Sequence, residues 1–147
     1  MDGGKWAVLK PSEQKFKLSE ESALGEMQRL CDYYDVNITA LPEEQIVAVD
    51  QVLAKLLTAF KTGRLELKED DKGLSVIQNL RNGETLTYRE LAGKDKARLN
   101  LNPDNLLKAV HTLMGLLCGL GEDVTGKLSG PDLKAMEGLG QYFLALC

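Results

Sequence analysis

The chain has 147 residues, of which 44% are hydrophobic and 27% charged, and its net charge is −4 at pH 7. A chain of this length and composition is expected to form one globular domain whose core needs no disulfide or metal. Its basic residues are scattered among acidic ones, so it has no basic patch to neutralise a phosphate backbone, and nucleic-acid binding is not expected.

Residues 1–17 contain two adjacent glycines and a proline and are expected to be loosely ordered, ahead of a single α+β domain over 18–147. Ser19 is a suitable helix N-cap, and the two glutamates that follow suit the positive end of a helix dipole. Apolar residues then recur at helical spacing, which predicts an amphipathic helix. These apolar residues are Leu24, Met27, Leu30, Cys31 and Tyr34.

A second helix is predicted over 42–62, completing a helical segment over 18–63. Pro42 suits the first helical position, because its missing N–H would have no partner there, and Gly63 suits the left-handed residue that follows a helix. The apolar face of this helix is wide. It comprises Ile46, Val49, Val52, Leu53, Leu56, Leu57 and Phe60.

The periodicity then changes from helical to alternating, which predicts a three-stranded antiparallel β-meander over 64–91. Asn82-Gly83 predicts a type I′ turn between the second and third strands, because both central residues of that turn need a positive φ. The side chains expected to face inward are Leu74, Val76, Gln78, Leu80, Leu86 and Tyr88.

A pair of C-terminal helices is predicted over 102–147. The first begins at Asn102-Pro103-Asp104, runs over 103–118 and is apolar around more than half its circumference, as expected of a central element. Ser129 and Asp132 are predicted to form a capping box at the start of the second. Gly140 lies inside that helix and costs about 1 kcal/mol relative to alanine, which predicts close approach of another backbone, that of the preceding helix.

The sequence shows no arrangement typical of a catalytic, cofactor-binding or metal site. His111 is the only histidine and has no histidine, cysteine or paired acid one helical turn away. The GxG pairs at 119–121 and 138–140 lack the preceding strand and third glycine of a dinucleotide-binding motif. We therefore predict a protein that is not an enzyme and has no cofactor, with a small enzyme as the least favoured alternative.

The expected compartment is the cytoplasm. Three cysteines without short spacing predict neither a disulfide framework nor a zinc site, which suits a reducing cytosol. The N-terminal residues lack the apolar segment of a signal peptide, and no apolar run reaches the roughly 20 residues that span a bilayer, so no membrane association is expected.

Tyr88-Arg89-Glu90-Leu91 is the most distinctive polar segment. An arginine on the open side of a small sheet anchors an acidic partner, joins a cross-strand ion pair or is simply solvated. Tyr88 and Arg89 are therefore candidate partner-binding residues.

Four motifs follow one another in the second half of the chain: the strand Leu86–Leu91, the turn Gly93-Lys94-Asp95, the helix end Leu117-Cys118-Gly119-Leu120, and the step from Leu128 to Leu133 ahead of a helix containing Phe143. In this order they resemble the tail assembly chaperones of long-tailed bacteriophages and prophages, over about residues 75–146. Members of that family begin near the hairpin, whereas here about sixty residues precede it.

The resemblance implies a non-catalytic cytosolic protein that binds the long helical tape-measure protein and keeps it soluble until the tail tube polymerises around it. Helices 42–62 and 103–118 are expected either to supply a groove for this client or to pack on each other as core. Val52, Leu56 and Phe60 are the candidate contacts on the first of them. The alternative function is a small structural or regulatory adaptor of prophage origin, with homo-oligomerisation through helix 42–62.

Overall fold

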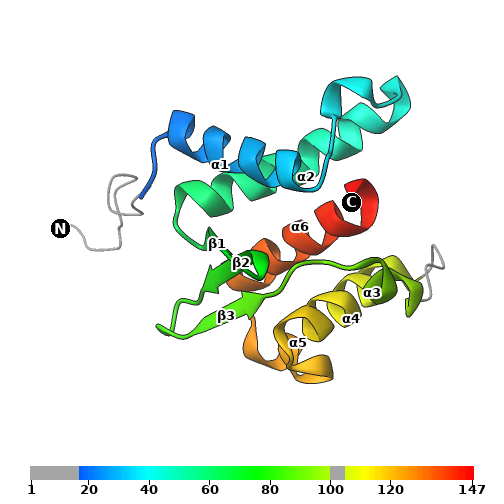
Figure 1. Cartoon of the computed structure of the whole chain (residues 1–147). Coiled ribbons are helices and arrows are strands. Elements are labelled where there is room, and N and C mark those ends of the chain that lie inside the picture. Colours follow the sequence, from blue (N-terminus) through cyan, green and yellow to red (C-terminus); the bar gives the residue numbers. More distant parts are fainter. Residues whose placement is uncertain (1–16, 100–104) are drawn as a thin grey trace.

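In the computed structural model, which describes residues 17–99 and 105–147, the chain forms an α+β fold around a three-stranded antiparallel sheet (Figure 1). The elements in chain order are α1 (Glu20–Tyr33), η2 (Ile38–Ala40), α2 (Glu43–Lys61), β1 (Leu65–Asp70), β2 (Gly73–Asn79), β3 (Thr85–Tyr88), α3 (Gly93–Ala97), α4 (Leu106–Cys118), η4 (Gly121–Asp123), α5 (Val124–Lys127) and α6 (Pro131–Leu146).

The predicted α+β class is confirmed, and the arrangement is richer than two helices on either side of a meander. The short helices α3 and α5 add to the four long ones. The predicted helix start at 102–104 lies outside the described residues, and so do residues 1–16 of the segment predicted to be loosely ordered over 1–17. The described part of α4 begins at Leu106, after Asn105.

Local signals mark the start of α1 and the end of α2. Ser19 is the N-cap of α1, and its Oγ accepts a hydrogen bond of 3.1 Å from the backbone N–H of Ser22. Gly63 follows α2 with a φ of +75°, as predicted. Pro42 is the N-cap residue of α2 rather than its first helical residue, and it supplies no side-chain hydrogen bond.

The predicted capping box of the last helix is wrong. The N-cap of α6 is Gly130, one residue after Ser129. The carboxylate of Asp132 turns instead to the hairpin, where its Oδ2 accepts a hydrogen bond of 3.2 Å from the backbone N–H of Arg81. A tertiary contact between the sheet and α6 therefore replaces the local one.

The sheet has β2 at its centre, paired antiparallel with β1 and β3. Val76 lies opposite Leu67 on one side and opposite Tyr88 on the other. The predicted alternation is confirmed, since every side chain expected to face inward is buried. These side chains are Leu74, Val76, Gln78, Leu80, Leu86 and Tyr88.

The turn between β2 and β3 differs from the predicted type I′. Only Gly83 has a positive φ, of +91°, whereas Asn82 does not. The N–H of Gly83 donates to the carbonyl of Leu80 at 3.0 Å, and the N–H of Leu80 donates to the carbonyl of Glu84 at 2.8 Å. This is the pattern of a type I turn followed by a left-handed glycine, the next most common way to close a hairpin.

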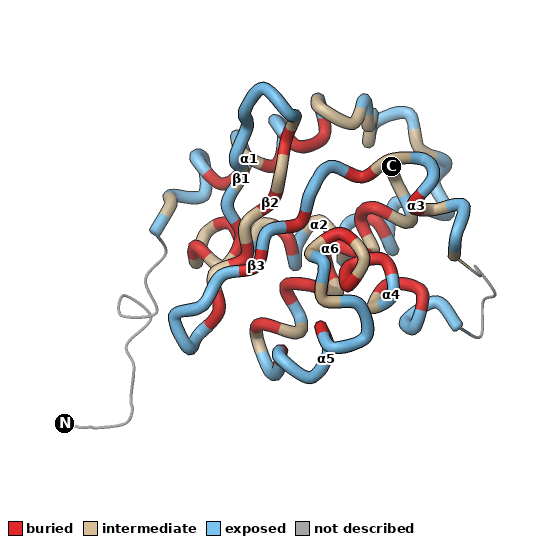
Figure 2. Tube along the Cα trace, turned by 60° about the horizontal axis from the view of Figure 1, so that its bottom comes forward, coloured by how far each residue is buried: buried red, intermediate tan, exposed pale blue. Residues whose placement is uncertain are grey.

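Helix α6 is the centre of the core and lies between α2 and α4, packing against both (Figure 1). Figure 2 shows buried positions concentrated along α6 and on the parts of the neighbouring elements that face it. Its fully buried side chains include Met136, Leu139, Tyr142 and Phe143.

Close packing at Gly140 occurs as predicted, but against side chains. A Cβ at this position would lie 2.6 Å from Val110 Cγ1 and 3.0 Å from Met114 Cγ, both on α4. The close backbone approach is found at Gly115 of α4 instead, where a Cβ would collide with the carbonyl group of Gly121.

Candidate functional site

A groove lies between α2 and α4, with the C-terminal part of α6 as its floor. Because α6 packs against both helices, it holds them apart on this side of the molecule (Figure 1). The groove has a volume of about 650 Å³. It is lined by Ala48, Gln51, Val52, Lys55, Leu106, Leu107, Val110, Gln141, Leu144 and Ala145.

Large apolar side chains are exposed at the mouth of this groove. Leu106 and Leu107 are 52% and 53% exposed at the start of α4. Val47 is 69% exposed and lies one helical turn before Gln51, on the same side of α2. Five large apolar side chains are exposed in the part of the chain described, and two of them, Leu106 and Leu107, line the groove. A concentration of this kind is typical of an interaction surface.

The inner end of the groove is polar. The ammonium of Lys55 on α2 donates to Gln141 Oε1 on α6 across 3.4 Å. The stem of Lys55 lies against α6 one turn earlier, where a Cβ on Gly138 would be 3.2 Å from Lys55 Cβ. The glycine therefore allows the lysine to lie across α6 and close the groove at this end.

Three apolar residues of α2 were predicted to contact a client, and only Val52 is in position to do so. It is half-buried and lines the groove. Leu56 and Phe60 are 1% and 0% exposed and belong to the core. The wide apolar face of α2 is divided between α1 and α6, both of which pack against it, and this buries the two residues nearer the sheet.

Tyr88 is also buried, and this removes it from the candidate partner-binding residues. Its side chain is 0% exposed, and its hydroxyl donates to Gln78 Oε1 at 2.6 Å. The Nε2 of Gln78 in turn donates to the carbonyl of Asp132 at 2.7 Å. Burial raises the pKa of Tyr88 well above its ordinary value. Tyr88 is thus a neutral donor in a buried link between the sheet and α6.

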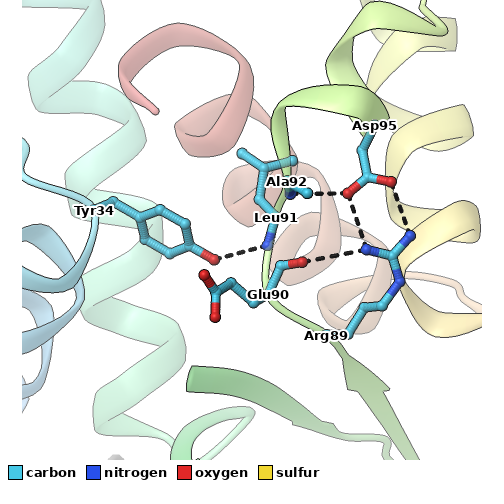
Figure 3. Close-up of polar contacts among 6 residues, drawn as sticks. All are labelled: Tyr34, Arg89, Glu90, Leu91, Ala92 and Asp95. Atoms are coloured by element: carbon cyan, nitrogen blue, oxygen red, sulfur yellow. Dashed lines mark hydrogen bonds and ion pairs between the residues drawn. The ribbon is translucent and has the colours of Figure 1, made fainter. Parts of the chain in front are cut away.

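Arg89 lies at the surface, but an internal acid engages its guanidinium (Figure 3). Its Nη1 and Nη2 donate to the two carboxylate oxygens of Asp95 at 2.9 and 2.8 Å. The backbone N–H of Ala92 donates to the same carboxylate at 2.9 Å. The hydrogen bonds from Arg89 lower the pKa of Asp95 to about 2.

This ion pair corrects the predicted cross-strand pairing of Arg89. Its acid, Asp95, lies between two lysines in the sequence, yet it is 1% exposed. Arg89 pairs along the chain with the short helix α3 rather than across the sheet. The available signal was an acid at the third position of a helix, which caps the helix start.

Tyr33, the last residue of α1, and Tyr34, its C-cap, form hydrogen bonds with the residues that follow β3. The backbone N–H of Leu91 donates to the hydroxyl of Tyr34 at 2.9 Å (Figure 3). Tyr33 donates to Glu90 Oε1 at 2.6 Å and accepts from the backbone N–H of Leu74 at 3.2 Å. Burial raises the pKa of Tyr34 to about 12. The N-terminal helical segment is therefore joined directly to the sheet and to the segment that leaves it.

A second cavity, of about 440 Å³, lies beside α4 and includes His111 in its wall. His111 Nε2 and Glu137 Oε2 are 2.7 Å apart. Much of the remaining wall is apolar, with Leu99, Leu116 and Val124 among its residues. The described residues contain no group of three side chains suited to a metal ion. That the protein is not an enzyme and binds no cofactor or metal stays a prediction.

Comparison of this chain with models of protein families, with curated proteins and with solved structures gave no match. The resemblance to tail assembly chaperones therefore rests on the sequence motifs alone. Among the described helices, none has both the length and the apolar composition that crossing a membrane requires.

Proposed function

We propose that this chain is a non-catalytic binding protein that holds an amphipathic helix of a protein client in the groove between α2 and α4. The observation that carries this proposal is the apolar groove, with the exposed side chains of Leu106 and Leu107 in its lining. An amphipathic helix binds other proteins by placing its apolar stripe in such a groove. A client helix here would lie on α6 and cover Val52 and Leu144.

The narrower proposal is a phage-type tail assembly chaperone in the bacterial cytoplasm, with a tape-measure-like protein as the client. The order of motifs from the hairpin to the last helix supports it, and so does a groove that can hold the apolar stripe of a helical partner. This function uses no cofactor, metal, nucleic acid or membrane. The N-terminal helical segment has a direct part in it, because α2 provides one wall of the groove.

Co-expression with a tape-measure protein encoded beside this chain tests the proposal. We expect the wild-type chain to raise the soluble fraction of the client. Leu107→Asp should abolish this effect, because it places a charge in the groove at a side chain that is 53% exposed and whose change leaves the core intact. Thr87→Asp, on the exposed side of β3, is the matched control and should act like wild type. If the client is no more soluble with the wild-type chain than alone, the proposal is wrong.

A homo-oligomeric adaptor is the second candidate, and the exposure of Val47 favours it. This side chain is 69% exposed and is not among the residues that line the groove, so a client seated there need not cover it. Light scattering over a range of concentrations distinguishes the two candidates. A stable dimer that Val47→Lys converts to a monomer supports the adaptor, and a monomer at all concentrations rejects it.

A further inference from the structure

Among the described residues, Lys55 is the only charged one that lines the groove, and its position is defined by α6. The aliphatic stem is packed at Gly138, and the ammonium is 3.4 Å from the amide oxygen of Gln141. A lysine held in this way presents its charge at one place, the inner end of the groove.

This charge lacks an acidic partner in the described part of the chain. The ion pairs of that part involve other basic residues, and the one side-chain hydrogen bond given for Lys55 goes to a neutral amide. The other residues that line the groove are apolar or carry uncharged amides. A bound apolar stripe would therefore remove water from around a cation whose charge no carboxylate offsets, and this is unfavourable unless the occupant supplies an acid.

We infer that the client helix carries an aspartate or glutamate at the end of its apolar stripe that lies over Lys55. This inference rests on the proposed function and specifies the chemistry of the partner. Ala48 and Lys55 are seven residues apart on α2, so the groove is about two helical turns long, or roughly 10 Å. The matching motif is a pair of apolar residues three or four positions apart with an acid one turn beyond them.

Selection from a displayed library of helical peptides tests the inference. Each peptide has a fixed leucine stripe over two turns and randomised residues at the polar positions on both sides of it. The targets are the wild-type chain, Lys55→Glu and Lys108→Glu. Lys108 is the matched control, since it is also an exposed lysine but lines the separate cavity beside His111.

We expect acids to be enriched at one end of the stripe with the wild-type chain and with Lys108→Glu, and bases to replace them with Lys55→Glu. One selected peptide and its Glu→Gln variant should differ about threefold in Kd for the wild-type chain, as expected of a partly exposed ion pair. This difference should disappear with Lys55→Ala.

Leu107→Asp separates this inference from the proposed function. If selected peptides lose binding to Leu107→Asp but show no enrichment of acids, the groove binds helices and the inference about Lys55 is wrong. If no peptide is selected, or if binding is unaffected by Leu107→Asp, the proposed function fails and the inference fails with it.

Discussion

Replacing Asp95 by asparagine should destabilise the chain in a way that depends on pH. The substitution keeps the size of the side chain and removes the charge that Arg89 engages with two hydrogen bonds. The N–H of Ala92 still has an acceptor in the asparagine oxygen, although a neutral oxygen accepts a weaker hydrogen bond than a carboxylate does. The loss therefore reports the charge of a carboxylate that is 1% exposed.

The size of the effect follows from the pKa of Asp95, which Arg89 lowers from 3.8 to about 2. Lowering the pKa of a carboxyl group by one corresponds to about 1.4 kcal/mol in favour of its charged form, which gives an upper limit of about 2 kcal/mol here. The side chain of Arg89 is 46% exposed, so solvent screens part of the attraction. We expect a loss of about 1.5 kcal/mol at pH 7.

The sign of the pH dependence follows from the lower pKa of Asp95 in the folded state. The stabilisation is fully present above the unfolded value of 3.8 and is lost as the pH falls towards 2. The wild-type chain should thus lose its advantage over Asp95→Asn between about pH 4 and pH 2.

Urea denaturation of the wild-type chain and of Asp95→Asn at pH 7, 4 and 2.5 measures the difference in their free energies of unfolding. Glu69→Gln is the control, because Glu69 pairs with Arg29 at 3.2 Å with both side chains largely exposed, and its loss should stay within about 0.5 kcal/mol. An equal difference between wild type and Asp95→Asn at every pH would show that the charge of Asp95 has no part in the effect. A difference below about 0.5 kcal/mol at pH 7 would refute the importance of the ion pair itself.

Three further substitutions test the packing. Gly140→Leu should cost at least about 2 kcal/mol, because the new side chain meets Val110; thermal unfolding like that of wild type contradicts this. Gly25→Ala should stabilise α1 by about 0.5–1 kcal/mol, since nothing lies within 4 Å of the new Cβ, and a lower melting temperature contradicts it. Tyr34→Phe should cost about 1 kcal/mol and speed hydrogen exchange at the amide of Leu91, and unchanged exchange shows that this bond contributes nothing.

Patterns that depend on near neighbours in the sequence predicted their structures well. The alternation of apolar residues placed Val76 and Tyr88 on the inner face of the sheet, and Ser19 marked the start of α1. The predicted capping box failed because Asp132 bonds to the backbone of Arg81, which is fifty-one residues away. Local spacing carries no information about such a competitor.

The groove was predictable only in outline. The wide apolar faces of helices 42–62 and 103–118 indicated a surface between them, but the residues assigned to it included Leu56 and Phe60, which are core. Which part of a wide face stays open depends on how α1 and α6 share it, and this is a property of the tertiary structure. The partnership of Arg89 with Asp95 was missed because a turn, rather than a strand pairing, brings them together.

Binding of a client helix between α2 and α4 can be mapped directly from amide shifts in ¹H–¹⁵N spectra of the labelled chain. A helical peptide from a tape-measure protein is added in steps. If the client lies in the groove, the amides of 48–55 in α2, 106–110 in α4 and 141–145 in α6 should shift, and Leu107→Asp should abolish these shifts. Shifts confined to the outer face of the sheet, or a client that binds Leu107→Asp as tightly as wild type, would contradict binding in the groove.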